Sequence, residues 1–86
     1  MKVVFNIAYL TGYDYDTNPA EWPFEAYPVL GDVIDEATII KVFGSIPMDK
    51  EPEERFTRPQ FKVWSRYFDT RNEVSYLWIE LREYEG

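Results

Sequence analysis

The sequence predicts an all-β protein, a small five-stranded antiparallel meander or barrel. Residues 73–84 alternate between apolar and polar side chains, which is the period-2 pattern of a strand. Residues 2–10 are mostly apolar on both of their alternating faces, as in a strand with neighbours on each side. Prolines and charged runs divide the rest of the chain into short β-rich segments. The expected strands are 2–10, 29–35, 38–46, 60–69 and 73–84.

Residues 11–28 form a long connection in which three prolines oppose regular structure. Five aromatic rings are too many for a passive linker, because connections of this length are usually packed as a unit or functional. We expect Trp22 and Phe24 to fold back as a lid, on the barrel or on the outer face of the hairpin described below. Tyr13, Tyr15 and the neighbouring acids stay open to a recognition role.

The same connection contains a partial calcium motif. Asp14, Asp16, Asn18 and Glu25 have the spacing of positions 1, 3, 5 and 12 of an EF-hand loop. Position 6 of that loop must be Gly, and here it is Pro19, which cannot adopt the positive φ required. The simpler interpretation is that short acids and Asn form turns, so no metal site is expected.

Residues 29–46 allow two interpretations. A short helix within 32–43 is supported by Asp32 as a cap and by Gly44 at a helix stop. Two strands, 29–35 and 38–46, are supported by the many β-branched residues in the segment. The strands are the main prediction, and the helix is the alternative.

The hairpin formed by 60–69 and 73–84 has a register that can be derived from the apolar pattern. A three-residue loop, 70–72, pairs Val63 with Ile79 on an apolar face, and Asn72 tolerates the left-handed position that closes such a loop. The predicted outer face then carries Trp64, Arg66, Phe68, Tyr76 and Trp78. Either another segment covers these rings or they form a binding platform, and cover is the simpler account.

Composition limits the function classes. The chain has 86 residues, enough for one small domain at 1–86, and contains neither His nor Cys. No stretch approaches a membrane span and the N-terminus lacks a secretory core, so we expect a cytoplasmic protein and no membrane partner. Residues 47–59 are predicted to be a charged, proline-punctuated connection.

The net charge of the chain argues against direct binding to nucleic acid. The net charge is −7, and residues 1–44 hold two lysines against seven acidic residues. Binding to phosphates needs a basic surface, so direct nucleic-acid binding is not expected. The acidity fits either solubility or attraction to a basic partner protein.

Three segments carry a weak resemblance to known proteins. Residues 28–34 (Pro-Val-Leu-Gly-Asp-Val-Ile), 61–69 and 74–81 resemble small uncharacterised β-barrel proteins of bacteria and their phages, akin to Tudor-like barrels. The similarity covers 28–82 and implies a barrel fold. It implies no activity, and the insertion at 11–27 lies outside it.

The sequence favours binding over catalysis. Without His or Cys, acid–base or nucleophilic chemistry would depend on carboxylates, Ser, Tyr or Lys in predicted turns and loops, so no catalytic residue and no cofactor are expected. One hypothesis is a protein-interaction module with an aromatic face and an acidic rim, either binding another protein or forming a homodimer. The alternative is an acidic inhibitor of the anti-restriction or anti-CRISPR type that blocks a basic nucleic-acid-binding surface. The candidate partner-binding residues are Trp64, Arg66, Phe68, Tyr76, Trp78, Tyr13, Asp14, Tyr15, Asp16, Glu21 and Glu25.

Overall fold

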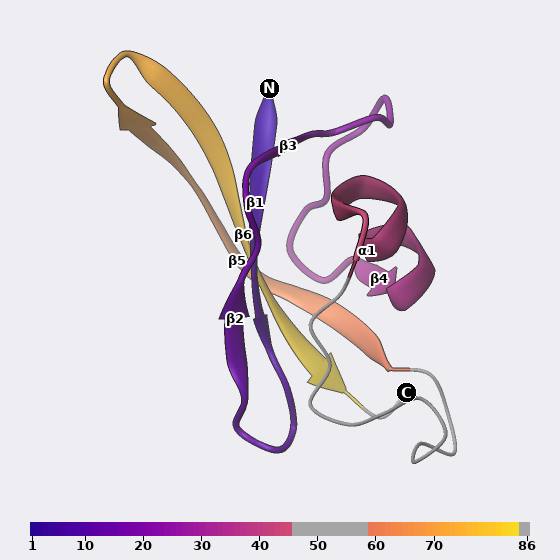
Figure 1. Cartoon of the computed structure of the whole chain (residues 1–86). Coiled ribbons are helices and arrows are strands. Elements are labelled where there is room, and N and C mark those ends of the chain that lie inside the picture. Colours follow the sequence, from indigo (N-terminus) through magenta and orange to yellow (C-terminus); the bar gives the residue numbers. More distant parts are fainter. Residues whose placement is uncertain (46–58, 85–86) are drawn as a thin grey trace.

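A twisted, open β-sheet with one helix on one of its faces forms the protein (Figure 1). The computed structural model describes residues 1–45 and 59–84. The six strands follow the order β2-β1-β6-β5-β4, with β3 also paired to β1. The all-β class is confirmed, but the sheet does not close into a barrel. The elements are β1 (Lys2–Ala8), β2 (Asp14–Asp16), β3 (Ala20–Glu21), β4 (Val33–Asp35), α1 (Glu36–Phe43), β5 (Gln60–Arg71) and β6 (Val74–Tyr84).

β1 is an interior strand with neighbours on both sides, as its apolar sequence predicted, but it runs parallel to β6. Its register sets Val3 beside Leu77 and Phe5 beside Ile79. The prediction of a wholly antiparallel meander is therefore wrong. Apolar periodicity indicates which side chains share a face, whereas strand direction depends on how the chain crosses back.

The hydrophobic core lies on one side of the sheet, under α1 and the part of the long connection that contains Trp22. Phe5, at the centre, is fully buried and contacts Trp22 at a ring-centroid distance of 6.0 Å and Phe43 at 4.9 Å. Trp22 therefore folds back as predicted, onto the face that α1 covers. The buried core residues are Val3, Phe5, Ile7, Tyr9, Ile34, Ile39, Phe61, Val63, Leu77, Ile79 and Leu81.

The predicted strand at 38–46 is wrong, and the alternative short helix is correct. Asp35 caps α1, because its carboxylate accepts a hydrogen bond from the Thr38 N–H at 2.8 Å. Gly44 ends the helix in the left-handed conformation, with φ of 83°, and donates to the Ile40 carbonyl. Helix propensities differ by less than about 1 kcal/mol per residue, so two caps and the burial of Ile39 outweigh the β-branched composition. The cap is Asp35 rather than Asp32.

The predicted strand at 29–35 is shorter in the structure, where β4 begins at Val33. Residues 29–32 form a turn in which Asp32 accepts a hydrogen bond from the Val29 N–H through its side chain. The turn still contacts β5, because the Gly31 N–H donates to the Val63 carbonyl. Gly31 has φ of 89°, which favours glycine at this position.

The hairpin of β5 and β6 is present, but its predicted register is wrong. Asn72 and Glu73 alone form the turn, with φ of 50° and 66°, the positive values of a type I′ turn. A β-bulge between Val63 and Ser65 then shifts the pairing by one residue. The position of the turn sets Trp78 opposite Tyr67 instead of Trp64, since the bulge lies beyond this pair.

Residue 46 of the predicted third strand and residues 47–58 of the predicted connection lie outside the described residues. Within 1–45 and 59–84, no helix has the length and apolar character needed to cross a membrane.

Candidate functional site

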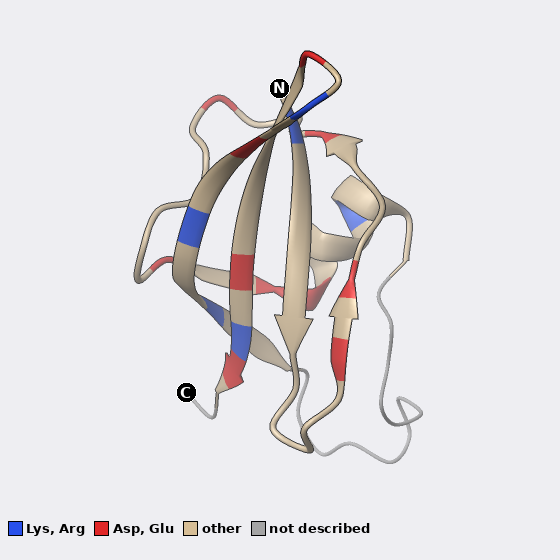
Figure 2. Ribbon diagram, turned by 90° about the vertical axis from the view of Figure 1, so that its left-hand side faces the viewer, with Lys and Arg blue, Asp and Glu red and all other residues tan. Residues whose placement is uncertain are grey.

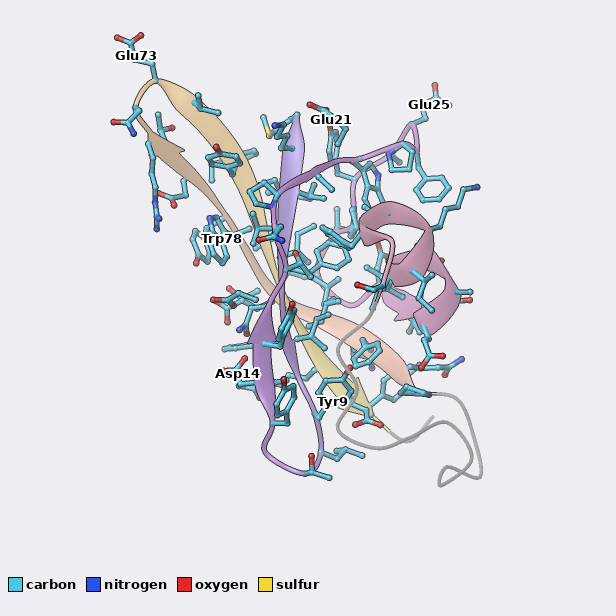
Figure 3. All side chains as sticks on the ribbon, viewed as in Figure 1. Tyr9, Asp14, Glu21, Glu25, Glu73 and Trp78 are labelled. Atoms are coloured by element: carbon cyan, nitrogen blue, oxygen red, sulfur yellow. The ribbon has the colours of Figure 1, made fainter. Side chains whose placement is uncertain are left out.

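The side of the sheet opposite α1 has no layer of described residues over it; we call this side the outer face. Figure 2 views the sheet from this side, and Figure 3 shows Trp78 and Asp14 projecting away from α1. The strand registers place alternate residues here, because side chains alternate across a strand. Its members include Val4, Asn6, Asp14, Asp16, Lys62, Trp64, Tyr67, Asp69, Arg71, Tyr76, Trp78, Glu80 and Arg82.

Two stacked rings mark the centre of the outer face. Tyr67 and Trp78 are cross-strand partners whose ring planes are 1° apart and whose centroids are separated by 6.1 Å. Tyr67 keeps 46% of its surface exposed. The Trp78 indole Nε1 is buried and has no hydrogen-bond partner among the described groups. A buried N–H without a partner costs about 1–3 kcal/mol, so this tryptophan is not optimised for folding alone.

A groove of about 410 Å³ lies beside this ring pair. Val4, Tyr76 and Trp78 line one part of it, and the segment containing Thr17 and Pro19 lines another. The lining is completed near the hairpin tip by Asp69, Arg71, Asn72 and Val74. Apolar surface with a few polar groups at the edge is typical of sites that accept a side chain or small ligand.

Carboxylates lie along one row of the outer face. The Asn6 Nδ2 donates to Asp14 Oδ1 at 2.6 Å and to Asp16 Oδ1 at 2.8 Å, so one neutral amide holds two acids together. Glu80 is the neighbour of Asn6 on β6. Among the described residues, none of these three acids forms an ion pair.

Three cations on the outer face have partners other than the row, and a fourth, Lys2, lies beside Tyr76 on β6. The Arg82 guanidinium lies 3.8 Å from the centroid of the Trp64 ring, and the Lys62 ammonium lies 5.2 Å from that of Tyr84. Arg71 pairs with Asp69 at 2.9 Å. None of these three cations forms a salt bridge with Asp14, Asp16 or Glu80.

The negative charge of this row affects the tyrosine beside it. Burial of the phenol raises the pKa of Tyr67, and the negative charges of Glu80, Asp69 and Asp16 raise it further. Arg71 acts in the opposite direction. The outer face is thus a site of negative potential next to exposed rings.

Two of the predicted binding residues lie on the opposite face. Arg66 and Phe68 pair with Ile79 and Leu77, which point to the core side. The Arg66 guanidinium donates to the Pro28 carbonyl at 2.6 Å and lies 6.0 Å from the Phe68 ring centroid. The turn at Asn72 and Glu73 sets this pairing, and the bulge between Val63 and Ser65 lets Phe61 and Val63, beyond it, face the core as well.

The predicted residues of the long connection separate in the same way. Asp14 and Asp16 reach the outer face through β2. Tyr13 and Tyr15 stack on each other at 6.5 Å, and Tyr13 contacts the buried Tyr9, so these rings lie on the core side. Trp64, Tyr76 and Trp78 remain on the outer face as predicted.

Two predicted acids lie away from the carboxylate row (Figure 3). Glu21 is in β3, 3.5 Å from the N-terminal ammonium group, and Glu25 is near α1. Asp14 and Asp16 belong to a strand rather than to a loop between two helices. In the described part of the chain, no group of three or more acidic side chains could hold a metal ion.

Sequence reasoning missed Tyr67, Asn6, Glu80 and Val4. The signal for Tyr67 was the position of the turn, which lies at Asn72 and Glu73 instead of the predicted 70–72. Glu73 disguised the shorter turn, because type I′ turns usually have Gly at the second position. The other three residues depend on the pairing of β1 with β6, which joins segments far apart in the sequence.

Comparison with protein-family models, with curated proteins and with solved structures finds no match for this chain.

Proposed function

We propose that the protein is a non-enzymatic interaction module that binds another protein through its outer face. The main support is the Tyr67–Trp78 ring pair, which is partly exposed beside an apolar groove and includes a buried indole N–H without a described partner. Protein interfaces derive much of their energy from Trp, Tyr and Arg. The exposed Trp64, stacked with Arg82, extends the same surface.

Photo-crosslinking from the two faces of the hairpin tests this proposal. A photoreactive phenylalanine analogue replaces Trp64, Tyr67 or Phe68 in separate variants, which are then irradiated in cells of the native host. All three positions are exposed, but Phe68 lies on the opposite face and serves as the matched control. We expect one protein to be crosslinked from positions 64 and 67 and not from 68. Equal crosslinking from all three positions, or from none, would contradict the proposal.

The carboxylate row supports a second candidate function, an acidic inhibitor that occupies a basic nucleic-acid-binding surface of its partner. In that case Asp14→Asn, Asp16→Asn and Glu80→Gln together abolish binding, whereas Trp64→Ala has little effect. An aromatic-led module loses most of its binding on Trp64→Ala and only part of it in the triple variant. Binding measured at low and high salt separates the two further, because salt screens exposed charges.

We infer a cytoplasmic location and an origin in a bacterium or a phage. The resemblance of residues 28–82 to small barrel proteins of those sources is the basis for this inference. Neither function needs a cofactor, a membrane or direct contact with nucleic acid. Fractionation of the native host, followed by detection of the protein, would test the location.

A further inference from the structure

The outer face combines an apolar groove with a row of unneutralised acids. Arg82, Lys62 and Arg71 each have a ring or a carboxylate as partner. Asp14 and Asp16 share only the neutral Asn6 amide. A positive group from outside the described residues would therefore find three carboxylates and no competing cation in an ion pair with them.

The distance between the two features follows from the register. Tyr76 lines the groove, and Glu80 lies four residues further along β6 in the carboxylate row. Four residues of a strand span about 13 Å. In an extended ligand, residues four positions apart also point to the same side, so both can face the sheet at once.

We propose that the outer face binds an extended segment of a partner protein, with an apolar side chain in the groove and a Lys or Arg four residues away on the carboxylate row. This rests on the proposed function and specifies the chemistry of the partner. The raised pKa of Tyr67 supports it, since Glu80 and Asp16 contribute negative potential there.

Other occupants fit the surface less well. A metal ion lacks a suitable group of ligands among the described residues. A second copy of this chain would bring the same three carboxylates and a further net charge of −7 to the interface. Nucleic acid would place phosphates against the acids.

Selection from a library of randomised nine-residue peptides tests the inference, with the intact protein as the target. We expect the enriched peptides to share an aromatic or aliphatic residue followed, four positions later, by Lys or Arg. Their affinity should fall by about fivefold or more in the triple variant Asp14→Asn, Asp16→Asn and Glu80→Gln, a loss equivalent to one or two exposed ion pairs. The affinity of these peptides for the wild-type protein should also fall when the salt concentration is raised.

Two matched controls accompany the selection. A control variant combines Glu25→Gln, Asp32→Asn and Glu83→Gln, which change the net charge by the same amount away from both the row and the groove. It should change affinity by less than about twofold. Val74→Lys charges the lining of the groove and should abolish binding of the apolar residue. Val33→Lys, at an equally exposed position on β4, should not.

The outcomes separate this inference from the proposed function. If no basic residue is enriched at the expected position, or if the triple variant binds the peptides as tightly as the wild type, the inference is wrong. Crosslinks confined to positions 64 and 67 would still support the proposed function in that case. Crosslinking that does not distinguish the two faces would contradict the proposed function itself.

Discussion

Two residues at the tip of the hairpin determine which side chains reach the outer face. Asn72 and Glu73 both have positive φ and form a two-residue turn, where a three-residue loop would set Trp64 opposite Trp78. Asn tolerates this conformation, whereas Glu does so at a cost of about 1–2 kcal/mol. The strained Glu73 is thus linked to the position of Tyr67 beside Trp78.

We predict that Glu73→Gly stabilises the protein by about 0.5–1 kcal/mol. Gly removes the strain at positive φ, although part of the gain is offset by its greater freedom in the unfolded chain. Urea unfolding of wild type and variant measures the difference. Glu73→Ala also removes the charge but keeps a Cβ, so it should give no comparable gain. Equal stabilisation by both would show that charge rather than φ is responsible.

Thr17 supports the edge of β1 with its side chain. Its Oγ1 accepts a hydrogen bond from the buried Phe5 N–H at 2.9 Å, at a point between β2 and β3. Thr17→Val keeps the shape but leaves that N–H without its acceptor, so we predict a loss of about 1–3 kcal/mol in unfolding free energy. Thr17→Ser retains the oxygen and should recover most of the loss. Similar unfolding free energies for Thr17→Val and Thr17→Ser, measured in urea, would contradict this role.

The titration of Tyr67 reports the potential of the outer face. Its raised pKa means that the folded protein holds the phenolic proton more tightly than the unfolded chain does. The associated stability is complete below the unfolded pKa, about 10, and is lost as pH rises through the folded value. We predict that Glu80→Gln moves the Tyr67 pKa back toward the ordinary value, as measured by NMR titration of its ring carbons. A Tyr67 pKa that does not respond would remove Glu80 as a cause.

At the level of secondary-structure elements, α1 shows how local capping decides an ambiguous segment. Residues 36–43 contain β-branched side chains that favour a strand, yet Asp35 and Gly44 supply the two ends of a helix. The hydrogen bonds that the Asp35 carboxylate accepts from Thr38 lower its pKa. The ionised form of Asp35 is therefore more stable in the folded protein than in the unfolded chain.

We predict that Asp35→Ala destabilises the protein by about 1 kcal/mol at neutral pH. Because the folded pKa is lowered, this contribution is present above the unfolded value, about 3.9, and is lost as pH falls through the folded value. The unfolding free energies of the wild type and of Asp35→Ala should therefore become equal in strong acid. Asp35→Ser, which keeps a capping oxygen, should lose less at neutral pH. A gap between wild type and Asp35→Ala that persists in strong acid would contradict this account.

At the scale of the whole molecule, the sheet packs its core on one face and exposes the other. The chain carries a net charge of −7, and three outer-face acids lack a described counter-ion. Self-repulsion of this kind opposes the compact state.

We predict that sodium chloride, raised from about 0.05 to 0.5 M, increases the unfolding free energy, because it screens repulsion between the acids. Thermal unfolding at a series of salt concentrations measures the effect. The gain should be smaller for the variant Asp14→Asn and Asp16→Asn. A salt response unchanged by these substitutions would place the repulsion elsewhere on the molecule.

The amino-acid sequence by itself determined the all-β class, the position of β1 between two neighbours, the two arms of the hairpin and the folding back of Trp22 onto the rest of the protein. These features follow from periodicity and composition, which act over a few neighbouring residues. The sequence also identified Trp64, Tyr76 and Trp78 as outer-face residues, and named Asp14 and Asp16 as candidate binding residues without placing them on that face.

Only the tertiary structure decided the parallel pairing of β1 with β6, and the turn and bulge that together exchange Arg66 and Phe68 for Tyr67 on the outer face. It also joined Asn6 to Glu80 and so created the carboxylate row. The physical reason is that a side-chain pattern defines the two faces of each strand separately. The neighbours across the sheet, and any shift between them, depend on backbone hydrogen bonds between segments distant in the sequence.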